Sequence, residues 1–156
     1  MTPDEAGAAR RSAAMGGAVV DEAAIALLID TFYARVRKDA VLGPVFERAV
    51  AETEWPAHLA RMRAFWSSVM LTSGRYKGEP VAAHRAVSGI APDMFGRWLD
   101  VFEATADELF VPEVAERFAD KARRIGESLK LALFFRAAEP WPDDLRKRGR
   151  GTPACG

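Results

Sequence analysis

The stretch from Trp55 to Thr72, WPAHLARMRAFWSSVMLT, carries the clearest signal of the fold class. Its apolar and aromatic residues recur at intervals of three and four, at positions 55, 59, 62, 65, 66, 69 and 70. This spacing predicts one apolar face on an α-helix about 27 Å long. Thr53 is a candidate N-cap, and Pro56 is tolerated in the first turn. His58 stands four residues before Met62 and shares its side of the helix.

The same helical period runs through the rest of the chain. An earlier helix has the apolar stripe Ile25, Leu28, Ile29, Phe32, Tyr33 and Val36, with Asp21 before it as a cap. Gly43-Pro44 is expected to break the chain before a short helical turn around Phe46. A short helix over 80–87 and two longer ones, opened by Pro92 and starting near residue 112, follow. Because no segment alternates with period two, we expect an all-α fold with four main helices.

Composition narrows the function classes. The 156 residues are 49% hydrophobic and 28% charged, and 22 Lys and Arg balance 22 Asp and Glu. A neutral chain has no overall attraction to nucleic acid or an anionic membrane, and no apolar run reaches the roughly 20 residues that span a bilayer. The single cysteine, Cys155, excludes an internal disulfide and fits a cytoplasmic location. We expect one domain over 19–136, a disordered arm at 1–18 and a flexible tail at 137–156.

The chain has only two histidines, His58 and His84, on different expected helices. Taken singly, each is most simply a core histidine bonded to a backbone carbonyl. Tyr33 and Trp98 add two polar groups to otherwise apolar stripes, and buried phenol and indole groups need partners. One polar cavity that collects Tyr33, His58 and Trp98, with His84 opposite, would satisfy all of them.

Few cofactors fit such a cavity. Two histidines are too few for a closed zinc site, no Glu-x-x-His pair supports a di-iron centre, and phosphate-binding and hydrolase motifs are missing. A planar apolar cofactor held by one neutral imidazole does fit, and haem is such a cofactor. The alternative is a cofactor-free helical interaction or sensor module, in which the aromatic stripe is plain core.

Five stretches carry a resemblance to a known family. They are FYARVRKD at 32–39, LGPVF at 42–46, WPAHLARMRAFW at 55–66, YKGEPVAAH at 76–84 and MFGRWLDVFE at 94–103. In this order and at these spacings, the chain from about residue 25 to 135 resembles the truncated haemoglobins of group III. The resemblance implies a shortened globin, a two-over-two helical sandwich around haem b (iron protoporphyrin IX).

The resemblance also implies a role for individual residues. His84 matches the proximal ligand of the haem iron, whereas Tyr33, His58 and Trp98 match distal residues that stabilise a bound ligand. Residues matching positions that line or hold the haem are Phe46, Met62, Phe65, Trp66 and Arg61. Arg61 either pairs with a haem propionate or is a solvated surface arginine.

A function follows as an expectation. The resemblance implies a five-coordinate haem iron that binds O2, NO or CO beneath polar donors. Such donors slow the release of a ligand, which suits ligand retention or O2, NO or peroxide chemistry better than transport. The resemblance leaves open whether the protein is an enzyme, with nitric oxide dioxygenase or peroxidase-like activity as the candidates. Since no reductase domain is recognisable in the sequence, turnover would need an external electron donor.

Overall fold

The computed structural model describes residues 20–87 and 89–136, and every regular element in these ranges is helical. The elements are α2 (Glu22–Lys38), α3 (Leu42–Ala49), the 3-10 turn η1 (Glu52–Glu54), α4 (Trp55–Leu71), α5 (Pro80–Arg85), α6 (Asp93–Leu109), α7 (Pro112–Lys130) and the π-helical turn η2 (Leu131–Arg136). The prediction of an all-α fold is confirmed. The arm expected at 1–18 and the tail expected at 137–156 lie outside the described residues.

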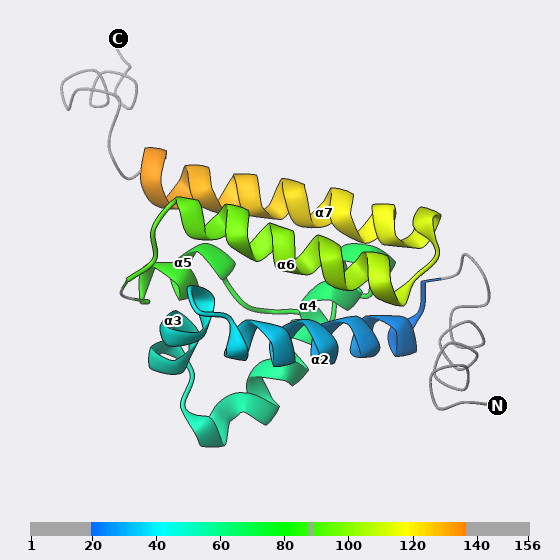
Figure 1. The fold of residues 1–156 in the computed structure, drawn as a ribbon, viewed down its shortest axis with the longest axis horizontal. Helices are drawn as coiled ribbons and strands as arrows, with labels where there is room; N and C mark the ends of the chain where they lie inside the picture. Colours follow the sequence, from blue (N-terminus) through cyan, green and yellow to red (C-terminus); the bar gives the residue numbers. More distant parts are fainter. Residues whose placement is uncertain (1–19, 88, 137–156) are drawn as a thin grey trace, which may run out of the picture.

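The long helices form two packed pairs. α6 and α7 run side by side in opposite directions, and α2 lies below them in Figure 1. α2 packs against α4, α3 and α6, so it is the element that joins the two pairs. This arrangement is the two-over-two sandwich that the sequence resemblance implied.

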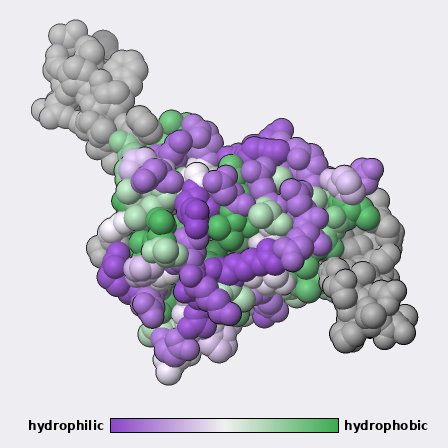
Figure 2. All heavy atoms as spheres, in the orientation of Figure 1, coloured by the Kyte–Doolittle hydropathy of each residue, from purple (hydrophilic) through white to green (hydrophobic). Residues whose placement is uncertain are grey.

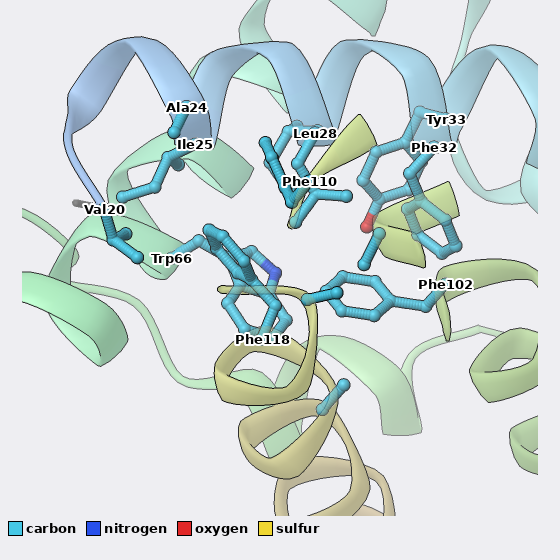
Figure 3. Close-up of a cluster of buried hydrophobic side chains, with 14 of the residues drawn as sticks. Val20, Ala24, Ile25, Leu28, Phe32, Tyr33, Trp66, Phe102, Phe110 and Phe118 are labelled. Atoms are coloured by element: carbon cyan, nitrogen blue, oxygen red, sulfur yellow. The ribbon is translucent and has the colours of Figure 1, made fainter. Parts of the chain in front are cut away.

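The core forms where α2 meets α4, α6 and α7. Every residue of the predicted α2 stripe is buried, and Ile25, Leu28 and Ile29 are fully inaccessible. Figure 3 shows Phe102 from α6, Phe118 from α7 and Trp66 from α4 converging on this stripe. Burying a side chain of this size contributes about 1.5–3 kcal/mol, so these contacts dominate the stability of the fold.

The start of α2 agrees with the prediction from the sequence, whereas the start of α3 does not. The Asp21 carboxylate accepts a hydrogen bond from the Ala24 N–H at 2.9 Å, which confirms the predicted cap. Gly43 and Pro44 do not break the chain but lie in the first turn of α3, where proline lacks only an N–H that needs no helical partner. A Cβ atom on Gly43 would lie 2.8 Å from the Arg37 carbonyl oxygen, so glycine lets α3 lie against the end of α2.

The predicted N-cap of α4 is wrong. Thr53 lies inside the 3-10 turn η1, and Glu54 occupies the N-cap position without a capping side-chain hydrogen bond. Because η1 runs directly into α4, Thr53 lies within helical backbone, one residue before the N-cap position. Pro56 lies in the first turn, as expected.

Hydrophilic side chains cover much of the face shown in Figure 2, with smaller apolar areas between them. Several arginines on the surface are paired with carboxylates, for example Arg35 with Glu108 and Arg63 with Asp30, each at 2.6 Å. Within the described ranges, none of the helices combines the length and the apolar character that crossing a membrane requires.

Candidate functional site

His84 lies on α5, a six-residue helix that begins at Pro80. Its Nδ1 atom is 2.7 Å from the Pro80 carbonyl oxygen, one helical turn earlier. A carbonyl oxygen only accepts hydrogen bonds, so Nδ1 carries the proton and donates it. In the neutral form of this tautomer, Nε2 has the lone pair that can bind a metal. A hydrogen bond of this kind orients a ligating imidazole and raises its basicity.

His58 lies on α4 with its Nε2 atom buried and without a hydrogen-bond partner among the described residues. Aromatic rings surround it: the ring centroids of Tyr33 and Trp55 both lie 5.2 Å from that of His58, in edge-to-face contact. Burial, with smaller contributions from Arg61 and His84, lowers the pKa of His58 to about 4. His58 is therefore neutral at pH 7, and its unpartnered nitrogen is available to a ligand.

Tyr33 brings a hydroxyl group to the same place. Its side chain leaves α2 toward the interior of the bundle (Figure 3) and is only 6% exposed. Its ring also contacts Phe46 from α3, at 5.8 Å between centroids. Burial raises the pKa of the Tyr33 phenol, so the group stays protonated and can donate a hydrogen bond.

Trp98, on α6, lies near the cluster formed by Tyr33 and His58. Its indole is half-buried and meets the Phe32 ring edge-to-face at 5.8 Å, while it stacks on Phe102 at 5.5 Å. Phe32 in turn contacts the neighbouring Tyr33 ring at 4.9 Å. The structure thus connects Trp98 to the Tyr33 and His58 group through Phe32.

The expected cofactor-lining residues divide into two groups. Phe46, Met62 and Phe65 are partly buried and pack against the edge of the core. Trp66 instead lies in the core, 2% exposed, with its ring stacked 4.9 Å from that of Phe102. Arg61 is exposed on α4, close enough to His58 to influence its pKa.

Trp55 belongs to the site although the sequence singled it out only as part of the apolar stripe. It is 4% exposed, and its ring contacts those of Tyr33, Phe46 and His58. The Arg37 guanidinium carbon lies 4.4 Å from the centroid of the Trp55 ring, in a cation–π contact. The available signal was its position three residues before His58, which puts both side chains on one side of α4.

These residues fit haem. On α4 only Trp55, Trp66 and Ser67 are fully buried, so most of the apolar face around Met62 remains half-buried and can accept a flat apolar group. No cluster of three or more His, Cys, Asp or Glu side chains occurs in the described part of the chain. A single imidazole from His84 suits a metal whose other ligands come from a macrocycle, and the unpartnered His58 nitrogen suits a ligand on the distal side.

Comparison with known proteins gives the family. No family model matches the chain. The chain is 30% identical over 117 residues to the group 3 truncated hemoglobin ctb of Campylobacter jejuni, covering 74% of this chain and 92% of that protein. The crystal structure of a group III truncated hemoglobin from Campylobacter jejuni superposes with a TM-score of 0.71 at 29% identity, covering 75% of this chain and 94% of the other. The chain belongs to the truncated haemoglobins, in group III.

Proposed function

We propose that this protein holds haem b with His84 as the proximal ligand of the iron, and that Tyr33, His58 and Trp98 act on a diatomic ligand at the distal side. Membership of the truncated haemoglobins supports haem binding and gaseous ligands, and it argues against the cofactor-free alternative. When bound, haem supplies an iron centre that takes O2, NO or CO.

The observation that carries the proposal is the pair of imidazoles that α4 and α5 present. The Pro80 carbonyl leaves the Nε2 lone pair of His84 available to a metal. The buried Nε2 atom of His58 has no protein partner among the described residues, a condition that costs about 1–3 kcal/mol unless a ligand relieves it. One helix thus offers a metal ligand and the other an unsatisfied polar group for the ligand.

The distal residues differ in what they offer. The Tyr33 phenol and the Trp98 indole donate hydrogen bonds, and the neutral His58 ring donates or accepts according to its tautomer. Each hydrogen bond to a partly charged ligand stabilises the complex by about 1–3 kcal/mol, so two of them slow release by about thirtyfold or more. Such a pocket is suited to retention or to O2, NO or peroxide chemistry rather than to transport.

Phe46, Met62 and Phe65 would pack on the porphyrin, because aromatic and thioether side chains make favourable contacts with a flat apolar ring system. Arg61 would pair with a propionate, because it is exposed on the same side of α4 as His58. Conversion of a bound ligand, as in nitric oxide dioxygenation or peroxide reduction, would draw electrons from a separate donor.

Titration of the purified protein with haemin tests the proposal. The wild-type chain is expected to bind one haem with an intense Soret band and to form a CO complex in the ferrous state. His84→Ala removes the ligand and is expected to abolish or sharply weaken that band. A colourless wild-type protein that takes up no haemin would refute the proposal.

A further inference from the structure

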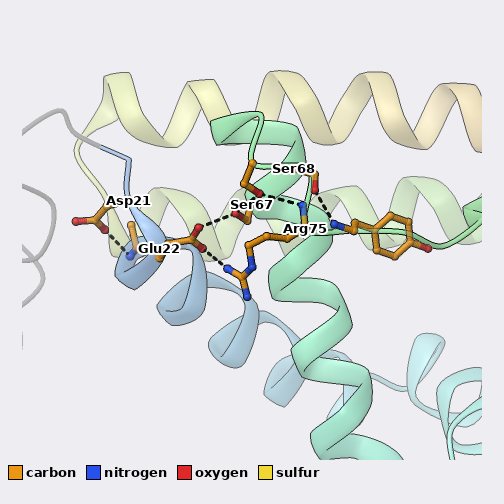
Figure 4. A network of polar contacts seen from close by, with 8 residues as sticks. Asp21, Glu22, Ser67, Ser68 and Arg75 are labelled. Atoms are coloured by element: carbon orange, nitrogen blue, oxygen red, sulfur yellow. Dashed lines mark hydrogen bonds and ion pairs between the residues drawn. The ribbon is translucent and has the colours of Figure 1, made fainter.

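A polar cluster joins the start of α2 to the end of α4 (Figure 4). Ser67 on α4 is completely buried, and its hydroxyl donates to the Glu22 carboxylate at 2.7 Å. The Ser73 hydroxyl oxygen lies 2.7 Å from that of Ser67. Since the single Ser67 hydrogen goes to Glu22, Ser73 is the donor of this second bond.

Arg75 closes the cluster from the loop over residues 72–79. Its guanidinium donates to the second carboxylate oxygen of Glu22 at 2.8 Å, and its backbone N–H donates to the Ser73 hydroxyl at 3.3 Å. Glu22, Ser67, Ser73 and Arg75, here called the Glu22 latch, therefore tie this loop to both long helices. The loop connects α4, which carries His58, to α5, which carries His84.

The tie continues along the loop toward α5. The Tyr76 backbone N–H donates to the Ser68 hydroxyl at 2.9 Å, and the Tyr76 ring packs on Phe65 at 5.2 Å between centroids. The Tyr76 phenol also lies against Gly78, where it leaves no room for a Cβ atom. Pro80, two residues later, begins α5, so the part of the loop held by these contacts ends close to the helix that carries His84.

α5 has little apolar packing of its own. None of its residues is fully buried, and at its other end the Arg85 guanidinium donates to the Ala132 carbonyl in η2 at a long 3.4 Å. α5 also lies against η2. The placement of His84 therefore depends on η2 and on the loop that precedes α5, rather than on burial of the helix.

We propose that the Glu22 latch positions His84: by fixing the loop over 72–79 to α2 and α4, it holds α5 where the His84 ring meets the metal. This inference rests on the proposed function, in which His84 is the proximal ligand. Glu22 and Arg75 are positioning residues, because they act through the loop and α5.

The test uses the full chain carrying Glu22→Ala, with Asp30→Ala as the matched control. Asp30 also pairs an α2 carboxylate with an α4 arginine, Arg63, but has no contact with the loop in the hydrogen bonds and ion pairs of the described residues. We measure hydrogen exchange of the segment 72–87, the rate of haem transfer to apomyoglobin, and the iron–histidine stretching band of the ferrous protein.

Glu22→Ala is expected to raise exchange in 72–87 and haem transfer about tenfold, and to shift or broaden the iron–histidine band. Asp30→Ala is expected to change both rates by less than about twofold and to leave the band unchanged. Arg75→Ala, on an exposed side chain, follows Glu22→Ala in direction, and Arg75→Lys restores most of the loss because a single nitrogen contacts Glu22.

Two results would overturn the inference. One is a hydrogen-exchange rate in segment 72–87 that Glu22→Ala leaves unchanged, and the other is equal effects of Glu22→Ala and Asp30→Ala on all three readouts. Wild-type haem transfer as fast as that of His84→Ala would instead overturn the proposed function, and the positioning role with it. If the wild-type protein retains haem but Glu22→Ala leaves hydrogen exchange of the loop unchanged, the positioning role of the Glu22 latch is refuted and the proposed function stands.

Discussion

The Asp39 carboxylate accepts hydrogen bonds from two neighbouring elements at the start of α3. Its side chain is 6% exposed, and one oxygen accepts from the backbone N–H groups of Val41 and Leu42, both at 2.9 Å. The other oxygen accepts from Nε and Nη2 of Arg97 on α6, at 2.9 and 2.6 Å. Asp39 thus joins the end of α2, the start of α3 and α6, the helices that carry Tyr33, Phe46 and Trp98.

The cost of removing this carboxylate can be worked out from those bonds. The two backbone bonds are equivalent to a helix cap, which contributes about 1 kcal/mol. The two-nitrogen contact with Arg97, whose side chain is half exposed, contributes about 1 kcal/mol more after screening by solvent. Asp39→Ala is therefore expected to lower the free energy of unfolding by about 2 kcal/mol at pH 7.

The contribution of Asp39 to the stability of the fold decreases as the pH falls. The Arg97 guanidinium, with the Leu42 and Val41 N–H groups, outweighs burial and lowers the pKa of Asp39 to about 2. The pKa in the unfolded chain is about 3.9. The contribution of Asp39 to stability is therefore complete above about pH 4 and is lost as the pH falls toward 2.

Urea unfolding followed by circular dichroism checks both points, with all proteins haem-free, because a bound cofactor adds to stability and would be released in acid. Asp30→Ala is the control, since its exposed pair with Arg63 contributes only about 0–1 kcal/mol. A loss in Asp39→Ala no larger than the loss in the control, or a loss that persists undiminished at pH 2, would refute the reasoning.

Further expectations concern the pocket and the core. Tyr33→Phe and Trp98→Phe each remove a hydrogen-bond donor and should speed O2 dissociation about tenfold in stopped-flow measurements, while unchanged rates would show that these donors do not hold the ligand. His58, with a pKa lowered to about 4, should add no titration step to ligand dissociation between pH 5.5 and 8; a step near pH 6.5 that vanishes in His58→Leu would contradict its burial. Phe102→Ala empties a fully buried ring site and should cost about 3–5 kcal/mol in urea unfolding, so a loss below 1 kcal/mol would mean that the core is elsewhere.

The helices and their buried faces could be predicted because they follow from local spacing. The α2 stripe from Ile25 to Val36 is buried as its period of three and four required, and the Asp21 cap lies where a short polar side chain precedes an apolar run. Local rules failed at Gly43-Pro44 and Thr53. At Gly43, contact with the end of α2 decides the conformation, and at Thr53 the 3-10 turn before α4 does.

The residues of the candidate site could be singled out from the sequence, but the contacts that hold them in place could not. His58 and His84 stand out because the chain has no other imidazoles, and their helices could be read from the sequence. The Glu22–Ser67 bond joins residues 45 positions apart, so only the folded chain brings them together. Trp55 was hidden for a different reason, since an aromatic residue on an apolar stripe looks the same whether it packs in a core or beside a ligand.

The most direct test of the central claim is the absorption spectrum of His84→Gly with and without added imidazole. Removing the side chain should weaken the Soret band and haem retention, and free imidazole entering the vacated space should restore a histidine-like ferrous spectrum. A His84→Gly protein that holds haem with the wild-type spectrum in the absence of imidazole would contradict the claim.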